Sequence, residues 1–336
     1  MITNSDLKKY DVDEMYKIYD RWAELAKKSY ELDCKSLEFD EINHIVFAGM
    51  GGSGAIGDVF SALFSKTNIH VTNVKGYILP KTVDSKTLVV CTSVSGNTDE
   101  TLNVLELARK LDCKLACFSS GGKMQEIATR NNIFYKKIPI VHSPRTSFMS
   151  YLYSILYMIK PLVPISKNEI YESLSALHDL SQKIKSSNMS SDNPSIELAE
   201  WIHLNPVIYF PSGLQSAAIR FKNCIQENVK MHTMIEDVVE ACHNNIVSWE
   251  HNSNFSPILL RGSDDFFKTK ERWEILKEYF TINKINFKEI NSINGNILTK
   301  LVYMIYLLDY ASIYLAIKNK TNPSTVKSID FIKSRL

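Results

Sequence analysis

The 336-residue sequence predicts an α/β protein with two doubly wound parallel-sheet domains and flanking helices. Three observations lead to this prediction. Short apolar runs alternate with helical stretches, polar turns follow the runs, and the second half repeats the order of the first in outline. Short apolar strands separated by helices are typical of βαβ units, which form parallel sheets. The length suits about two domains, and a hydrophobic content of 45% is ordinary for a soluble protein.

The first half predicts an opening amphipathic helix over Asp11–Leu32, followed by five strands. The strands are His44–Ala48, His70–Val74, Thr87–Thr92, Lys114–Phe118 and Ile133–Ile138. Four helices accompany these strands. The first follows the glycine turn and ends near Phe64, and the others cover Asp99–Leu111, Phe148–Leu162 and Lys167–Ile184.

The run from Ser186 to Ser195 is rich in Ser, Asn and Asp and is the expected linker. We therefore expect a first domain over residues 1–185, a linker over 186–194 and a second domain over 195–336. In the second domain the sequence predicts two strands, Val207–Phe210 and Pro257–Leu260. It also predicts four helices, over Gln215–Asn228, Phe266–Phe280, Asn296–Ile317 and Pro323–Lys333.

Composition excludes several classes of function. The formal net charge of +2 gives no reason to expect a nucleic-acid partner. The N-terminus has no apolar signal segment, and the apolar stretch Leu301–Leu308 is too short to cross a membrane. The six cysteines form no CxxC pair and no ligand spacing with histidine, so we expect no metal and a reducing, cytoplasmic location.

A glycine-rich turn follows the first strand. Gly49-Met50-Gly51-Gly52-Ser53-Gly54 fits the dinucleotide pattern G-x-G-x-x-G. That pattern also requires an acid at the end of the second strand, where this chain has Lys75 after Val74. A nicotinamide site and a turn that only allows close packing remain alternatives. We favour a turn whose backbone N–H groups approach another ligand at a helix N-terminus, without a cofactor.

The segment Thr92–Thr98, called the hydroxyl loop below, joins the third strand to a helix and reads Thr-Ser-Val-Ser-Gly-Asn-Thr. Several hydroxyl and backbone donors at a helix N-terminus suit a phosphate dianion. The alternative is simple helix capping by Asn97 or Thr98. Ser119–Lys123 repeats the device after the fourth strand. Ligands of doubly wound sheets bind at the carboxyl ends of the strands, where all three turns are expected.

These turns belong to an ordered set of motifs. They are Gly49–Gly54, Ser93–Thr98, Ser119–Lys123, Pro144-Arg145, Gln226–Lys230 (QENVK), His243–Glu250 (HNNIVSWE) and Leu307–Ala316. Together the motifs resemble the bifunctional phosphoglucose/phosphomannose isomerase family, over roughly residues 10–335. The resemblance implies tandem sugar-isomerase (SIS) domains with the active site between them, a homodimer and no metal.

The resemblance also implies roles for nine residues. Ser93, Ser95 and Thr98 would hold the phosphate of the sugar, and Gly51 and Ser53 would line the site. Four further residues would act near the reacting carbons. Arg145 would stabilise charge, Glu227 would be the catalytic base, His243 of the neighbouring subunit would assist ring opening, and Lys300 would lie near the substrate.

Three positions depart from the family pattern. Val94 stands where the family usually has Tyr, Asn245 where it has Glu, and Leu308 where it has Gly before Asp309. None of these departures removes one of the expected catalytic groups. They bear on local packing and sugar preference.

Aldose–ketose isomerisation needs a base that moves a proton between C2 and C1, and donors near the developing enediolate. A bound phosphate orients the reacting end of the sugar. The sequence therefore predicts interconversion of glucose 6-phosphate and fructose 6-phosphate, with mannose 6-phosphate as a second aldose. Two alternatives remain: an isomerase of another phosphosugar, and a sugar-phosphate-sensing SIS protein without catalysis.

Overall fold

The computed structural model describes residues 2–335, which form two compact units. One unit comprises Arg21–Leu174. The other combines the residues up to Asp20 with those from Ser175 onward, so a boundary falls inside helix α8 (Lys167–Ile184). The expected domain limits of 1–185 and 195–336 stay a prediction.

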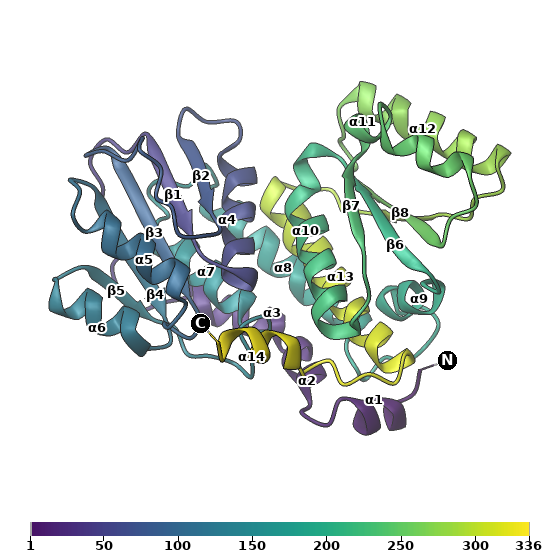
Figure 1. Ribbon diagram of the computed structural model, residues 1–336, viewed down its shortest axis with the longest axis horizontal. Coiled ribbons are helices and arrows are strands. Elements are labelled where there is room, and N and C mark those ends of the chain that lie inside the picture. Colours follow the sequence, from purple (N-terminus) through teal and green to yellow (C-terminus); the bar gives the residue numbers. More distant parts are fainter. Residues whose placement is uncertain (1, 336) are drawn as a thin grey trace. The chain divides into compact units, whose positions relative to one another are not determined.

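The unit formed by Arg21–Leu174 holds a five-stranded sheet in the order β2-β1-β3-β4-β5 (Figure 1). All four strand pairings are parallel, which confirms the predicted class. The strands are β1 (His44–Ala48), β2 (His70–Val74), β3 (Thr87–Ser93), β4 (Lys114–Ser119) and β5 (Phe134–Lys137). Because all of them run in one direction, their carboxyl ends lie along one edge of the sheet.

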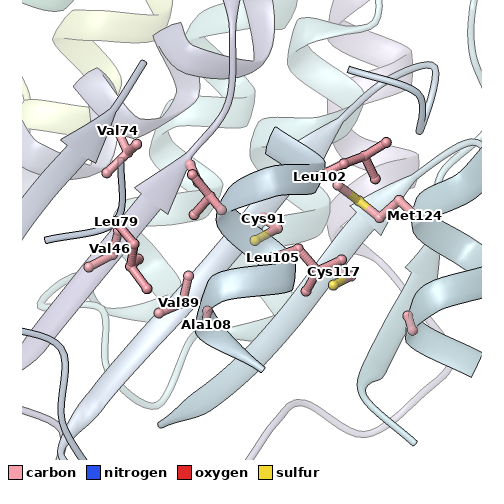
Figure 2. Packing of buried hydrophobic residues seen from close by; sticks show 13 residues of the cluster. Val46, Val74, Leu79, Val89, Cys91, Leu102, Leu105, Ala108, Cys117 and Met124 are labelled. Atoms are coloured by element: carbon pink, nitrogen blue, oxygen red, sulfur yellow. The ribbon is translucent and has the colours of Figure 1, made fainter. Parts of the chain in front are cut away.

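Helices cover both faces of this sheet (Figure 1). They are α4 (Gly51–Phe64), α5 (Asp99–Ala108), α6 (Gly122–Arg130) and α7 (Phe148–Met158). Helix α3 (Trp22–Tyr30) packs against α7. Alternate strand residues such as Val89 and Cys91 face α5 and α6, where Leu105 and Met124 complete a buried cluster (Figure 2). This alternation follows from the two-residue period of a strand. The cluster fixes the ends of β3 and β4 against their helices.

The second unit holds a four-stranded parallel sheet in the order β7-β6-β8-β9. Its strands are β6 (Asn205–Phe210), β7 (Met234–Asp237), β8 (Phe255–Arg261) and β9 (Lys288–Asn291). Its helices are α1 (Asn4–Tyr10), α2 (Met15–Asp20), α9 (Pro194–Trp201), α10 (Gln215–Cys224), α11 (Val238–Ala241), α12 (Phe267–Ile282), α13 (Ile297–Lys318) and α14 (Lys327–Lys333). Helices α10 and α13 lie on one side of the sheet, and α11 and α12 lie on the other (Figure 1).

The opening segment differs from the prediction. A single helix over Asp11–Leu32 is wrong, because that range holds two helices, α2 and α3, and a further helix, α1, precedes it. Thr3 and Asp6 form a capping box that starts α1 before the expected helix. Asp11 is buried and accepts a hydrogen bond from the backbone N–H of Tyr16 at 2.8 Å, while Glu14 is left-handed with φ +57°. These two features end one helix and start the next.

The stretch expected to be a linker is locally ordered. The backbone N–H of Ser186 donates to Asp20 Oδ1 at 2.7 Å. Asn193 is fully buried, and its Oδ1 accepts from the N–H groups of Ser195 and Ile196, which caps α9. The polar residues of this stretch therefore serve a turn and a helix start, and α9 is a helix that the prediction lacked.

Helix α13 is long and apolar enough to cross a membrane by length and composition. Its most apolar window is, however, 94% buried inside the protein. A core helix passes the same test of composition, and α13 packs against α9 and α10. Its burial makes α13 a core helix of its unit, and among residues 2–335 no second helix meets that test.

Candidate functional site

Hydroxyl groups gather where β3 ends. The Ser93 side chain is only 1% exposed, and its Oγ lies 2.8 Å from Thr98 Oγ1. Ser93 Oγ also accepts from the backbone N–H of Gly96 at 3.1 Å. Ser95 is exposed, and its Oγ accepts from the N–H of Asn97 at 3.2 Å. The loop thus folds into a compact turn with one buried and one exposed serine.

The capping alternative fails for this loop. Thr98 is the N-cap of α5, yet its side chain makes no capping hydrogen bond to that helix. The side-chain oxygen of Asn97 instead accepts from the N–H of Lys123 at 3.0 Å, in the first turn of α6. Neither side chain that the sequence offered as a cap for α5 performs that task. The first turn of α5 also carries Asp99 and Glu100.

Two glycines allow the close approach of these turns. A Cβ on Gly96, whose φ is +71°, would lie 1.8 Å from the carbonyl oxygen of Gly121. A Cβ on Gly49 would lie 3.0 Å from the carbonyl oxygen of Thr92. The first contact fixes the hydroxyl loop against the turn before α6, and the second fixes it against the turn before α4.

Gly51 and Ser53 lie in the first turn of α4. Gly51 is exposed, has φ +52° and faces open space, whereas Ser53 is buried. The N-cap of α4 is Met50, which offers no side-chain cap. Positive φ and open space at Gly51 leave the backbone there accessible to a ligand.

Arg145 lies in the segment that follows the carboxyl end of β5. Its side chain is 6% exposed. Its neighbour Thr146 donates its hydroxyl to Ser143 O at 2.9 Å, and Trp22 Nε1 donates to Thr146 O at 2.7 Å. Tyr151 of α7 then donates to Ile138 O at 2.9 Å. These bonds hold the Arg145 segment at the edge that carries the hydroxyl loop.

The carboxyl edge of the first sheet therefore collects six of the nine residues expected in the site. They are Gly51, Ser53, Ser93, Ser95, Thr98 and Arg145. The edge presents hydroxyls, helix N-termini and one guanidinium, and this combination suits an anion.

Glu227 lies in the second unit, in a π-helical turn (Ile225–Val229) that continues α10. Such turns are rare and are often found at functional sites. Glu227 is half-buried. The turn ends at Lys230 in a left-handed conformation, with φ +63°. Buried Asn228 donates to Ser312 Oγ of α13 at 2.8 Å, which fixes the turn against the core helix.

His243 and Lys300 lie elsewhere in the same unit. His243 is exposed and follows α11, which begins at the carboxyl end of β7. Lys300 is 7% exposed in the first turns of α13, and its Nζ donates to Asp264 in the turn after β8. Both residues therefore belong to the carboxyl edge of the second sheet. Asp264 is a partner that sequence reasoning missed.

Within one chain the structure separates Glu227 from these two residues. Helix α10 starts near the carboxyl edge and runs back for ten residues, about 15 Å, before the π-helical turn. Glu227 thus lies near the opposite edge, where Thr233 Oγ1 donates to Pro206 O just before β6 and β7 pair. A contact with α13 supports the same separation. Asn228, next to Glu227, contacts Ser312, and Ser312 lies twelve residues, about 18 Å, along α13 from Lys300.

The structure shows the surroundings of two positions that depart from the family pattern, Asn245 and Leu308. Asn245 accepts a hydrogen bond from the hydroxyl of Tyr209, which also accepts from Trp249 Nε1 at 2.7 Å. Leu308 is buried, and the Asp309 beside it pairs with buried Arg220, whose Nη2 lies 2.8 Å from Asp309 Oδ2. Burial raises the pKa of the Asp309 carboxyl, and the Arg220 guanidinium acts against that effect.

No group of three or more His, Cys, Asp or Glu side chains suited to a metal ion occurs between residues 2 and 335.

Two family models match the chain. The model of the SIS domain matches residues 38–158. The model of the bacterial phospho-glucose isomerase C-terminal SIS domain matches residues 191–336. The two matches cover the two sheets described above.

Curated relatives extend the similarity to nearly the whole chain. A bifunctional phosphoglucose/phosphomannose isomerase of Caldicellulosiruptor bescii is 31% identical over 93% of this chain and 96% of its own. A D-glucosamine-6-phosphate 4-epimerase of Sulfolobus acidocaldarius is 30% identical over 73% of this chain and 77% of its own. The C-terminal domain of glucosamine-fructose-6-phosphate aminotransferase from Francisella tularensis has a similar fold, with a TM-score of 0.69 at 16% identity, over 92% of this chain and 97% of that domain.

Proposed function

This chain belongs to the bifunctional phosphoglucose/phosphomannose isomerase family, whose members have two SIS domains, and we propose that it interconverts glucose 6-phosphate and fructose 6-phosphate. Mannose 6-phosphate is the proposed second aldose. An enediol intermediate has no stereocentre at C2, so one intermediate serves both aldoses. The observation that carries the proposal is the hydroxyl loop, whose side chains do not cap the helix they precede.

The hydroxyl loop would bind the phosphate of the sugar. Ser93, Ser95 and Thr98 offer hydroxyls, and α5 offers the N–H groups of its first turn. Hydrogen bonds to a dianion are charge-assisted and stronger than those between neutral groups. Gly51 and Ser53 would border the same pocket from α4. Binding energy at the phosphate would then orient the carbonyl end of the sugar.

Glu227 would move the proton. Its carboxylate would take a proton from C2 of the open-chain aldose, which gives the cis-enediol, and return it to C1. The reverse sequence converts the ketose. Arg145 would stabilise the negative charge that develops on the enediolate oxygens. His243 would assist opening of the sugar ring, and Lys300 would lie near the substrate.

The separation of Glu227 from His243 within one chain supports a shared site. A homodimer in which His243 of one subunit serves the Glu227 of the other would bring the two groups together. We therefore propose a homodimer with composite active sites, acting in the cytoplasm without nucleic-acid or membrane partners.

A second candidate is chemistry on another phosphosugar, such as an amino sugar. One relative supports this candidate. The D-glucosamine-6-phosphate 4-epimerase of Sulfolobus acidocaldarius is 30% identical to this chain, and the isomerase of Caldicellulosiruptor bescii is 31% identical. A sugar-phosphate sensor without catalysis is the third. It would need the hydroxyl loop and would not need Glu227.

One incubation separates these candidates. The purified protein is mixed with fructose 6-phosphate and EDTA, and the aldose products are identified by chromatography. We expect glucose 6-phosphate and mannose 6-phosphate. Neither product in a preparation that binds the sugar phosphate would contradict the proposal. Glucosamine 6-phosphate in the same assay tests the second candidate.

A further inference from the structure

Lys230 has an unusual backbone for a residue with a side chain. It follows the π-helical turn of Glu227 with φ +63° and ψ +35°, in the left-handed region. At the end of a helix this conformation is usually taken by glycine, because a Cβ is disfavoured there. This chain has lysine at a position where glycine would relieve the backbone.

The ammonium of Lys230 contacts a group of backbone carbonyls. Its Nζ donates to Glu227 O at 2.8 Å, to Asn322 O at 2.9 Å and to Asn228 O at 3.2 Å, and Pro323 O lies at 3.4 Å. An ammonium has three donors and no acceptor, so carbonyls suit it. The last carbonyls of a helix lack partners within the helix and carry partial negative charge. Lys230 thus joins the Glu227 turn to the segment before α14.

The turn is fixed from a second direction as well. Buried Asn228 donates to Ser312 Oγ, which itself donates to Asp309 O at 2.6 Å. Asn228 therefore holds the turn to α13, and Lys230 holds it to the residues that follow α13. The backbone of Glu227 lies between these two attachments.

We propose that Lys230 is a positioning residue, which fixes the π-helical turn through its carbonyl contacts and so holds the Glu227 carboxylate in place for proton transfer. The inference rests on the proposed role of Glu227. A displacement of about 1 Å in a reacting group can lower a rate by about a hundredfold, so a clamp on its backbone has a kinetic consequence.

Two other lysines provide matched controls. Lys284 follows α12 with φ +56°, and Lys320 follows α13 with φ +55°. Both are exposed, and within residues 2–335 neither side chain makes a hydrogen bond or ion pair. They share the backbone of Lys230 and lack its carbonyl contacts.

The test compares Lys230→Gly with Lys284→Gly and Lys320→Gly. Each glycine relieves a left-handed backbone, so we expect the Tm of Lys284→Gly and Lys320→Gly to equal or exceed that of the wild type. In Lys230→Gly the lost carbonyl contacts offset that gain, so its Tm should stay near that of the wild type. Lys230→Gly alone should lose at least about tenfold in kcat. Its KM for fructose 6-phosphate should change by less than about threefold, because the phosphate is held elsewhere. A structural role alone would not lower kcat in a variant of undiminished Tm.

A folded Lys230→Gly protein with wild-type kcat would overturn the inference. If that variant does not fold, the comparison of Lys230→Arg with Lys230→Met tests the clamp, because arginine keeps a cationic donor and methionine does not. A higher kcat in Lys230→Arg than in Lys230→Met supports the clamp, and an equal kcat in the two variants overturns it. Glu227→Gln is assayed in parallel. An inactive Glu227→Gln beside an active Lys230→Gly refutes the clamp alone, an active Glu227→Gln refutes the role of Glu227 as the base, and an inactive wild-type protein refutes the proposed function.

Discussion

The Ser93 and Thr98 hydroxyls illustrate what a sequence can predict at the scale of single residues. Their position after a buried strand follows from the pattern of apolar and polar residues. Their contact of 2.8 Å, and the use of Asn97 to cap α6, could not be predicted, because both depend on how the turn closes. Asp264, the partner of Lys300, was missed for the same reason, since it comes from a turn 36 residues away.

Removing hydroxyls from the loop should weaken substrate binding. We expect Ser95→Ala combined with Thr98→Ala to raise KM for fructose 6-phosphate by about tenfold or more, since each loses a bond to a charged group. The measurement is steady-state kinetics beside calorimetric binding of a sugar-phosphate inhibitor. Ser65→Ala is the control, because its hydroxyl only donates to Ala62 O at the end of α4. Wild-type inhibitor affinity in the double variant would show that the loop does not hold the phosphate.

At the scale of elements, strands β1 and β2 have the bounds that the apolar runs predict. Strands β7 and β9 were missed. Each is a four-residue edge strand, with two polar residues in Met-Ile-Glu-Asp and three in Lys-Glu-Ile-Asn. An edge strand needs no continuous apolar run, because one of its sides is not covered by a neighbouring strand. The start of α2 at Met15 instead of Asp11 was missed because it depends on the burial of Asp11 and its bond to the N–H of Tyr16.

The turn between β3 and α5 should not tolerate a side chain at Gly96. Gly96→Ala would place its Cβ on the Gly121 carbonyl and keep a positive φ, so we expect a loss of more than about 1 kcal/mol of stability together with weaker phosphate binding. Denaturant unfolding measures the first effect. Gly76→Ala, where a Cβ meets nothing within 4 Å, should leave stability nearly unchanged. Equal stability of the two variants would contradict the described turn.

Helices α10 and α13 are joined by the buried Arg220–Asp309 pair. Asp309→Ala would leave the Arg220 charge buried without its carboxylate, which costs about 3–5 kcal/mol. We expect a clear fall in Tm by calorimetry. Glu41→Gln, which breaks the exposed pair with Lys86, should change Tm little. An unchanged Tm in Asp309→Ala would show that the pair does not hold these helices together.

At the scale of the whole molecule, the sequence predicted two parallel-sheet domains because both halves carry the same order of strand, turn and helix. The limits of the compact units could not be predicted. The residues up to Asp20 belong with the second half, through contacts such as Tyr310 OH with Asp20 Oδ1 at 2.5 Å. Partners 290 residues apart leave no local signal in the sequence.

A composite site predicts complementation between inactive subunits. Glu227→Gln and His243→Ala are each expected to be nearly inactive as homodimers. After the two are mixed and allowed to exchange subunits, half of the dimers are mixed and each has one intact site of two, so about a quarter of wild-type activity should return. Native mass spectrometry confirms that mixed dimers formed. Confirmed mixed dimers without activity would contradict a site shared across subunits.

The central claim is that Glu227 transfers a proton between C2 and C1 of a phosphosugar. Isomerisation in deuterated water tests it most directly, because a proton held by a carboxylate exchanges with solvent. Wild-type protein should introduce deuterium at C1 of fructose 6-phosphate and at C2 of its aldose products, as seen by NMR. Folded Glu227→Gln should do so at least about a hundredfold more slowly while binding the inhibitor normally. Exchange at the wild-type rate in Glu227→Gln would assign the proton transfer to another residue.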